Sequence, residues 1–353
     1  MRIVLRTSAA RWLLERTLNA PFTLDDRPCD TGVVQIDSLR LDEAATMAAA
    51  ADFYSSFDER IAIEARLLRE HGVWLVISDA PPLACAAAAA AGIPCIVVAN
   101  FTWDWIYATY ASTSSDPAPM QNRHTSGSEL VRRLADAYAL AEAAWRLPLH
   151  GGFESFATIV DVPFVARHAR YDASETRARL ALPSRRRLAL SSFGGYGLDR
   201  LELHRLDCLD TWSVIVTGDR TPSDLPSNVI FIEDAAIYGR GLRYEDLVRA
   251  VDVVATKPGY GIVSECIANE TAIAYTTRGR FREYDALVAG IRRYLRSAFI
   301  DQSALRAGRW RAALDAAVAA PRPLERPPTD GAEAVADMIA ARLGSSAPPG
   351  SSA

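Results

Sequence analysis

The fold of this chain is decided by the stretch Val251-Asp-Val-Val-Ala-Thr-Lys-Pro-Gly-Tyr-Gly-Ile-Val-Ser-Glu-Cys-Ile-Ala-Asn-Glu-Thr-Ala-Ile-Ala-Tyr275. The apolar residues between Val251 and Ala255 are typical of a strand buried in a parallel sheet, and Pro258 ends it because proline has no N–H for the ladder. Gly259 and Gly261 then allow positive φ and leave no Cβ between the backbone and a ligand, and apolar residues at helical spacing follow at once. The stretch therefore predicts strand, glycine turn, helix and strand.

A ligand site is one interpretation of this glycine turn. A helix that begins behind such a turn attracts anions, because its free N–H groups and its dipole favour phosphate, and Ser264 and Glu265 lie in its first turns. The alternative is a βα turn whose glycines only permit tight packing, since two of the three positions of the dinucleotide fingerprint are a weak match. The charged Glu265, and a polar run from Thr276 to Asp285 after the next strand, favour a site at this sheet edge.

Strands and helices alternate along the rest of the chain, which predicts an α/β fold with doubly wound parallel sheets. The polar stretch that ends at Asp30 and the aromatic segment 100–107 are expected to be loops, and 153–168 is expected to be irregular. We expect further strands at 2–7, 33–36, 73–78, 93–98, 187–191, 212–217 and 229–231, and helices at 9–18, 41–51, 57–71, 84–91, 128–147, 244–250 and 333–343.

A chain of 353 residues exceeds what one hydrophobic core usually serves, so two domains are expected. We predict a first domain at 1–150 and a second at 187–320, with an interdomain crossing at 151–186 between them. A proline-rich linker and a terminal helix follow at 321–343, and the Ser/Pro/Gly tail 344–353 is expected to be disordered.

Composition excludes several classes of protein. The formal charge of −4 and the lack of a basic stripe argue against nucleic-acid binding. No uncharged apolar window is long enough to span a membrane, and five scattered cysteines without ligand spacing indicate reduced thiols, so we expect a cytoplasmic protein. The sequence has no P-loop, GxSxG, HExxH or EF-hand motif and no Asp-x-Asp pair, so neither a cofactor nor a metal is expected.

Several segments together resemble GT-B glycosyltransferases. They resemble the glycosyltransferase-like amino-terminal region of plant-type L-arabinokinases and, more distantly, the N-acetylglucosaminyl transferase that forms lipid II. The resemblance covers most of the chain and is carried by Ser78-Asp-Ala-Pro-Pro-Leu-Ala-Cys85, Val98-Ala-Asn-Phe-Thr-Trp-Asp-Trp-Ile-Tyr107, Phe193-Gly-Gly195, Lys257-Pro-Gly-Tyr-Gly-Ile-Val-Ser-Glu265, Tyr275 and Arg278-Gly-Arg-Phe-Arg-Glu-Tyr-Asp285.

The resemblance implies two Rossmann-like domains, with the acceptor side in the first and the nucleotide-sugar site in the second. It implies that Glu265 holds the ribose hydroxyls of a UDP donor, that the glycine turns lie along the diphosphate, and that Glu283 and Asp285 face the sugar. The donor side would comprise Gly194, Gly195, Lys257, Gly259, Gly261, Ser264, Glu265, Arg278, Glu283 and Asp285.

One departure from these relatives concerns the amino terminus. The relatives carry a strand with a Gly-His-Gly type loop and a helix ahead of the strand that matches residues 2–7, and that loop can hold the catalytic base. We therefore expect either a misassigned start codon or a first domain that lacks its first strand and helix. Asp79 and Asp104 are then the candidate catalytic carboxylates, although neither has a specific claim to be the base. Exposed edges of such a sheet would also favour a homo-oligomer.

The leading hypothesis is a glycosyltransferase of the hexosyl or N-acetylhexosaminyl type that passes a sugar from a UDP-linked donor to an unknown acceptor without a metal. The alternative is a non-catalytic protein that binds a nucleotide sugar in a regulatory role, which the missing first loop favours. Kinase activity is not implied, because the chain has no galactokinase-like half. A dehydrogenase is excluded because the first strand lacks a full dinucleotide fingerprint.

Overall fold

The computed structural model describes residues 2–112, 126–194, 203–219 and 224–345. The chain divides into two compact units, of which unit 1 comprises Met1–Val34 and Asp42–Asp161 and unit 2 comprises Gln35–Leu41 and Val162–Ala353. The expected first domain ended at residue 150, but unit 1 extends to Asp161 because the strand Ile159–Asp161 pairs with a strand of that unit. The expected tail, 344–353, lies almost wholly outside the described residues.

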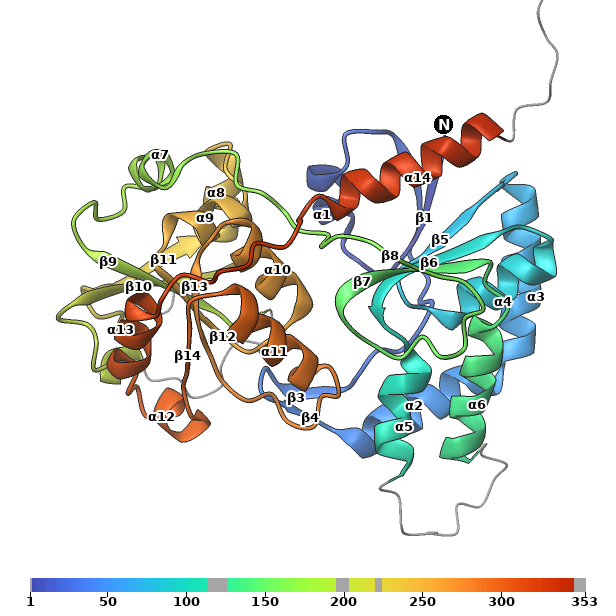
Figure 1. The fold of residues 1–353 in the computed structure, drawn as a ribbon, viewed down its shortest axis with the longest axis horizontal. Coiled ribbons are helices and arrows are strands. Elements are labelled where there is room, and N and C mark those ends of the chain that lie inside the picture. Colours follow the sequence, from blue (N-terminus) through green and yellow to red (C-terminus); the bar gives the residue numbers. More distant parts are fainter. Residues whose placement is uncertain (1, 113–125, 195–202, 220–223, 346–353) are drawn as a thin grey trace, which may run out of the picture. The chain divides into compact units, whose positions relative to one another are not determined.

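Unit 2 is built on a six-stranded parallel sheet with the strand order β11-β10-β9-β12-β13-β14 (Figure 1). Numbered within the unit, this order is 3-2-1-4-5-6, the doubly wound arrangement in which the strand order reverses between the first and fourth strands. The reversal lies between β9 and β12. The strands are β9 (Arg187–Ser192), β10 (Trp212–Gly218), β11 (Val229–Glu233), β12 (Val253–Thr256), β13 (Ala272–Tyr275) and β14 (Ser297–Phe299).

The core of unit 2 forms because apolar strand residues are covered by helices. All residues of β12 and β13 are buried, and Trp212 and Trp310 are fully buried in a cluster with residues of β9 and β14. The helices are α7 (Ala173–Arg179), α8 (Asp234–Gly239), α9 (Tyr244–Ala250), α10 (Tyr260–Ala268), α11 (Tyr284–Tyr294), α12 (Gln302–Arg306), α13 (Arg311–Ala319) and α14 (Gly331–Ser345), with a 3-10 turn η1 (Leu203–Arg205).

A short hairpin from early in the sequence also belongs to unit 2. It consists of β3 (Gln35–Asp37) and β4 (Arg40–Leu41), which pair antiparallel. Leu39 at its tip is fully buried in the core of unit 2, and Ser38 Oγ donates a hydrogen bond of 2.7 Å to the carbonyl of Phe193. The prediction that 33–36 is a strand of a main sheet is therefore wrong, because the hairpin forms a separate two-stranded sheet.

Unit 1 contains two separate parallel sheets. One has the order β1-β2 and the other the order β5-β6-β7-β8. The strands are β1 (Ile3–Arg6), β2 (Phe22–Asp25), β5 (Val76–Ser78), β6 (Cys95–Phe101), β7 (Ala143–Gly151) and β8 (Ile159–Asp161), and the helices are α1 (Arg11–Thr17), α2 (Glu43–Ser55), α3 (Phe57–Glu70), α4 (Pro82–Ala91), α5 (Trp103–Ala111) and α6 (Gly127–Tyr138).

The predicted helix at 128–147 is wrong in its second half. Helix α6 ends at Tyr138, and the apolar run from Ala143 begins β7, which pairs with β6. A short apolar run is compatible with a buried strand or a buried helix, so periodicity cannot separate them. The segment 153–168 was expected to be irregular, but it contains the short strand β8.

Two predicted loops are also wrong. The polar stretch that ends at Asp30 contains β2, which pairs with β1 in register from Ile3. The aromatic segment 100–107 contains the end of β6 and the first turns of α5. Its aromatic side chains pack inward, since Trp103 and Tyr107 are buried and stack with their ring centroids 5.2 Å apart.

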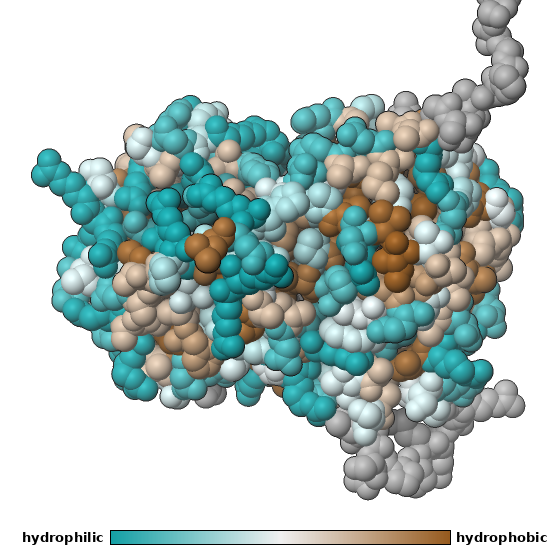
Figure 2. All heavy atoms as spheres, viewed as in Figure 1, coloured by the Kyte–Doolittle hydropathy of each residue, from teal (hydrophilic) through white to brown (hydrophobic). Residues whose placement is uncertain are grey.

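The α/β prediction with parallel sheets in both halves of the chain is confirmed by this architecture. Within the described ranges, no helix combines the length and the apolar character that crossing a bilayer requires. On the face drawn in Figure 2, hydrophilic residues are interspersed with smaller apolar patches.

Candidate functional site

The candidate donor site lies at the carboxyl ends of β9 and β12 in unit 2. These two strands are neighbours at the point where the strand order reverses, which is where open α/β sheets bind ligands. Thr256 Oγ1 donates to the carbonyl of Ser192, so the two strand ends are held together. Gly194 follows with φ +77°, a conformation that favours glycine. Gly195, expected beside it, lies outside the described residues.

The glycine turn after β12 borders open space. A Cβ added at Gly259 or Gly261 would meet no atom within 4 Å. Tight packing is therefore not the reason for these glycines, and neither is positive φ, because Gly259 has φ −149° and Gly261 lies within α10. No side chain caps the first N–H groups of α10. The turn thus leaves both room and donors for an anionic group.

Two cationic side chains stand near this turn. The pKa of Lys257 is lowered to about 8 by burial and by the charge of Arg278, while Asp37 of the hairpin acts in the opposite direction. The Lys257 ammonium donates to Gln35 Oε1 at 3.4 Å, and the Arg278 guanidinium lies 4.0 Å from the ring centroid of Phe281. A lysine whose charge is penalised in this way would be stabilised by a bound anion.

Glu265 is engaged by a side chain that the sequence did not single out. Its buried carboxylate accepts a hydrogen bond of 2.6 Å from Arg167 Nε and an ion pair from Nη2 of the same residue. Glu245 Oε2 lies 3.9 Å from Arg167 Nε and Glu245 Oε1 lies 3.7 Å from Arg243 Nη1. Burial raises the pKa of Glu265, although Arg167 opposes this shift. Two arginines thus balance two buried glutamates.

Arg167 precedes α7 in a segment with no helical or strand periodicity, and no local signal marks it. Its partner lies 98 positions away, so only the tertiary fold brings the pair together. Half of the Arg167 side chain is exposed, whereas the Glu265 side chain has 4% exposure. The arginine can therefore turn toward solvent or toward a ligand, while the glutamate is fixed.

The remaining predicted donor residues differ in accessibility. Ser264 is buried, and its hydroxyl donates to the carbonyl of Gly261 at 3.0 Å within its own helix. Glu283 is buried at the residue before α11, and Asp285 is exposed in the first turn of that helix. Of these three, Asp285 alone presents an exposed side chain.

The two predicted catalytic carboxylates lie in unit 1. Asp104 is buried in the first turn of α5 and accepts a hydrogen bond from Ser155 Oγ at 3.3 Å, and burial raises its pKa. Asp79 follows β5 and lines a cavity, where the surrounding protein and the charge of Asp30 raise its pKa.

Asp30 is a third carboxylate that the sequence did not indicate. It lines the same cavity as Asp79, accepts a 2.9 Å hydrogen bond from Trp103 Nε1, and has a pKa raised by burial. Two carboxylates that repel each other in a sheltered site tend to share a proton.

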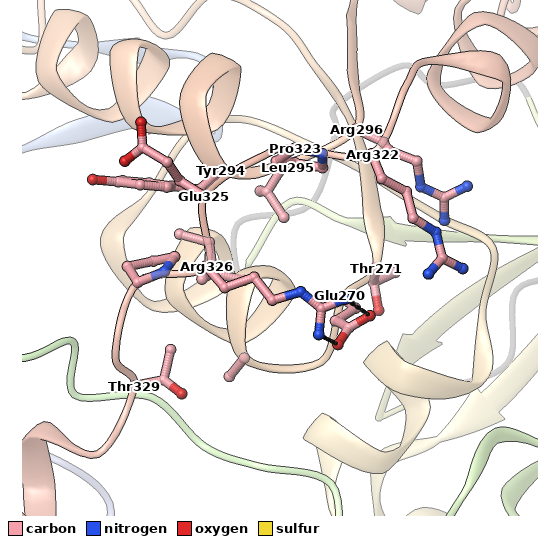
Figure 3. A pocket seen from close by; sticks show the side chains of 13 residues that line it. Glu270, Thr271, Tyr294, Leu295, Arg296, Arg322, Pro323, Glu325, Arg326 and Thr329 are labelled. Carbon is pink, nitrogen blue, oxygen red and sulfur yellow. Dashed lines mark hydrogen bonds and ion pairs between the residues drawn. The ribbon is translucent and has the colours of Figure 1, made fainter.

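A smaller cavity, of about 190 Å³, lies elsewhere in unit 2 (Figure 3). Thr271 and Arg296 line it and immediately precede β13 and β14, so it lies at the amino ends of these strands. Arg326 Nη1 pairs with Glu270 Oε1 at 2.8 Å across it. Its position at the wrong sheet edge argues against a role as the donor site.

Comparisons with known proteins identify the fold. No protein-family model matches the chain. The structure superposes on the calicheamicin glycosyltransferase CalG4 with a TM-score of 0.59 at 17% identity, covering 98% of this chain and 92% of that one. It superposes on the kitacinnamycin glycotransferase with a TM-score of 0.58 at 17% identity, covering 91% and 84%. The chain has the GT-B fold.

Two further relatives agree with this assignment. A UDP-glucosyltransferase from Polygonum tinctorium superposes with a TM-score of 0.55 at 14% identity, covering 98% of this chain and 92% of that one. In sequence, the chain is 28% identical over 296 residues to the L-arabinokinase of Arabidopsis thaliana. The matched segment is 82% of this chain. The matched part is 26% of the arabinokinase, so the chain spans about a quarter of that protein's length.

Proposed function

We propose that this protein is a glycosyltransferase that takes a sugar from a UDP-linked donor and passes it to an acceptor hydroxyl or amine. The observation that carries the proposal is the combination of Lys257, Arg278 and the uncapped start of α10 around the open space beside Gly259. This cluster supplies positive charge where a diphosphate would leave, and it does so at the reversal point of a GT-B sheet.

The donor would be held as follows. The diphosphate lies along the turns at Gly194, Gly259 and Gly261, and the buried Glu265 receives the ribose hydroxyls. Glu265 keeps acceptor capacity beside Arg167, since a carboxylate has about four lone-pair sites. The exposed Asp285 faces the sugar. UDP as the nucleotide is supported by the structural similarity to the Polygonum tinctorium enzyme, which is a UDP-glucosyltransferase.

The reaction would be a direct displacement at the anomeric carbon. The acceptor oxygen or nitrogen forms a bond to that carbon while the bond from the carbon to the phosphate oxygen breaks, and the electron pair departs with UDP. A carboxylate of unit 1 takes the acceptor proton, for which Asp79, supported by Asp30, is better placed than Asp104 because it borders a cavity. Lys257, Arg278 and the α10 dipole stabilise the charge that develops on the diphosphate.

Titration calorimetry tests the donor site. We expect UDP to bind the purified protein and ribose-free pyrophosphate to bind more weakly, because the second ligand cannot use Glu265. Lys257→Met should weaken both ligands, whereas Arg326→Met, at the opposite sheet edge, should change neither. Absence of UDP binding to the unmodified protein would contradict the proposal.

A non-catalytic nucleotide-sugar binding protein is the second candidate. The burial of Asp104, which leaves it little access to an acceptor, favours this candidate. Incubation with a UDP-sugar and water separates the two, because a transferase slowly hydrolyses its donor and a pure binding protein does not. The hexosyl or N-acetylhexosaminyl type of sugar and a cytoplasmic location are expectations from the sequence.

A further inference from the structure

The hairpin of β3 and β4 contacts the residues that follow three neighbouring strands of the unit 2 sheet. The carbonyl of Phe193, directly after β9, accepts a hydrogen bond from the hairpin. Lys257, directly after β12, donates from Nζ to Gln35 Oε1. A Cβ built at Gly279, beyond β13, would lie 3.4 Å from the carbonyl oxygen of Leu39. The hairpin therefore borders the same carboxyl edge of the sheet as the proposed donor site.

Asp37 holds the hairpin in this conformation. Its buried carboxylate accepts hydrogen bonds from the backbone N–H groups of Leu39 at 2.7 Å and of Arg40 at 2.9 Å. The guanidinium of Arg40 pairs with the same carboxylate at 2.8 Å, and that of Arg306 in α12 pairs with it at 3.4 Å. Because Leu39 at the tip is also buried in the core of unit 2, the backbone that carries Gln35 is fixed.

The orientation of the Gln35 side-chain amide follows from its partner. A lysine ammonium only donates hydrogen bonds, so the atom that faces Lys257 Nζ at 3.4 Å is the carbonyl oxygen Oε1. The nitrogen Nε2 then lies on the other side of the amide with its two N–H donors. In the part of the chain that the structure describes, no protein atom accepts a hydrogen bond from this nitrogen. Both donors are therefore available to an oxygen atom of a ligand.

The charges around Lys257 favour an anionic ligand at this point. Arg278 is the cation that acts on the ammonium, and Asp37 is the anion. Asp37 already pairs with the two guanidiniums of Arg40 and Arg306, so its charge is compensated within the hairpin and α12. A diphosphate has several anionic oxygens and can accept hydrogen bonds from an ammonium and an amide at once.

We propose that Gln35 is a donor-binding residue, whose Oε1 positions the Lys257 ammonium and whose Nε2 donates a hydrogen bond to an oxygen of the donor's diphosphate. This inference rests on the proposed function, because it requires the diphosphate to lie along the turn at Gly259. Gln35 lies 222 positions before Lys257 in the sequence, so only the tertiary fold brings the two residues together.

Titration calorimetry with UDP and with pyrophosphate tests this role. Gln35→Met keeps a side chain of similar length without the amide, and it should weaken both ligands about tenfold, because a hydrogen bond to a charged group is lost. Gln35→Glu should weaken both ligands further, because its carboxylate repels the diphosphate. Ile36→Ala changes the next residue of the same hairpin without removing a polar group, so it should leave both affinities unchanged. Thermal melts check that each variant is folded.

The pH dependence of UDP affinity separates a positioning role from a purely structural one. In Gln35→Glu a carboxylate stands beside Lys257, so the lysine keeps its charge to higher pH. The fall in UDP affinity with rising pH should therefore move upward by about one pH unit. Arg278 and Asp37, the other charged groups that act on this ammonium, are the same in both proteins. An unshifted profile would mean that Gln35 does not position the lysine.

Three results of the calorimetry would overturn the inference. Equal affinities of Gln35→Met and the unmodified protein for both ligands would remove Gln35 from the donor site and leave the proposed function intact. A loss confined to UDP, with pyrophosphate unchanged, would assign the amide to the nucleoside instead of the diphosphate. Absence of UDP binding to the unmodified protein would overturn the proposed function and this inference with it.

Discussion

Replacement of Glu265 by alanine separates a donor-binding role from a purely structural one. If the carboxylate holds both ribose hydroxyls, Glu265→Ala should weaken UDP binding by about 1.5–3 kcal/mol, the usual worth of hydrogen bonds to a charged partner. This corresponds to a Kd roughly 10- to 150-fold higher. Titration calorimetry on both proteins measures the difference, and equal affinities would remove Glu265 from the donor site.

Removing either partner of the ion pair between Glu265 and Arg167 should lower the free energy of unfolding by a different amount. Glu265→Ala leaves an arginine that is half exposed and still 3.9 Å from Glu245, so it can be hydrated at little cost. Arg167→Ala leaves a buried carboxylate without its cation, which costs less than the roughly 3–5 kcal/mol of a fully buried pair because Arg167 is half exposed and screened by water. Urea unfolding should therefore show the arginine variant as the less stable of the two. The opposite order would contradict this account of the pair.

At lower pH, Arg167→Ala should lose less free energy of unfolding relative to the unmodified protein. The pKa of Glu265 is already raised by burial, and loss of the arginine removes the opposing influence. A carboxyl whose folded pKa lies above its unfolded value favours the folded state below the unfolded pKa, and this contribution is lost as the pH rises through the folded pKa. The stability gap to the unmodified protein should therefore narrow as the pH falls from 7 toward 5. Glu265→Ala, which has no carboxyl there, provides the control.

Three further predictions follow from the proposed site. Because the folded pKa of Lys257 is about 8, UDP affinity should fall as the pH rises through 8 and lose this dependence in Lys257→Met, as measured by calorimetry at several pH values. UDP binding and donor hydrolysis should persist in excess EDTA, because the helix dipole and the cationic side chains neutralise the diphosphate without a metal. Loss of UDP binding on chelation, with recovery after Mg²⁺ is added, would contradict this. Asp79→Asn should reduce transfer at least 100-fold while UDP affinity stays unchanged, whereas Asp104→Asn should mainly lower the melting temperature.

The part of the second half around residues 244–275 was predictable because its signals are local, whereas α7, α8, α11, α12, α13 and β14 were not expected. The apolar run, the proline and the glycines after Val251 specify β12 and the start of α10 without help from distant residues. The helix predicted at 244–250 is confirmed with the same bounds. In this stretch the buried strand and the helix are separated by proline and glycine, so they can be told apart.

The first half was less predictable because its signals are nonlocal. The hairpin at Gln35–Leu41 has no periodicity that assigns it to unit 2, and only the burial of Leu39 in that core does so. The start of β7 was hidden in an alanine-rich segment that continues the composition of α6. Arg167 and Asp30 could not be recognised as site residues, since each acquires its partner through the fold.

The two units place different demands on the proposed reaction. In unit 2, the sheet is continuous across its reversal point, and every predicted donor residue that the structure describes belongs to this unit. In unit 1, the candidate carboxylates Asp79 and Asp30 line one cavity beside β1 and β5. The base must lie within reach of the acceptor proton, because base catalysis depends on geometry before pKa. Donor binding should therefore be unaffected by Asp79→Asn, whereas transfer should depend on this carboxylate.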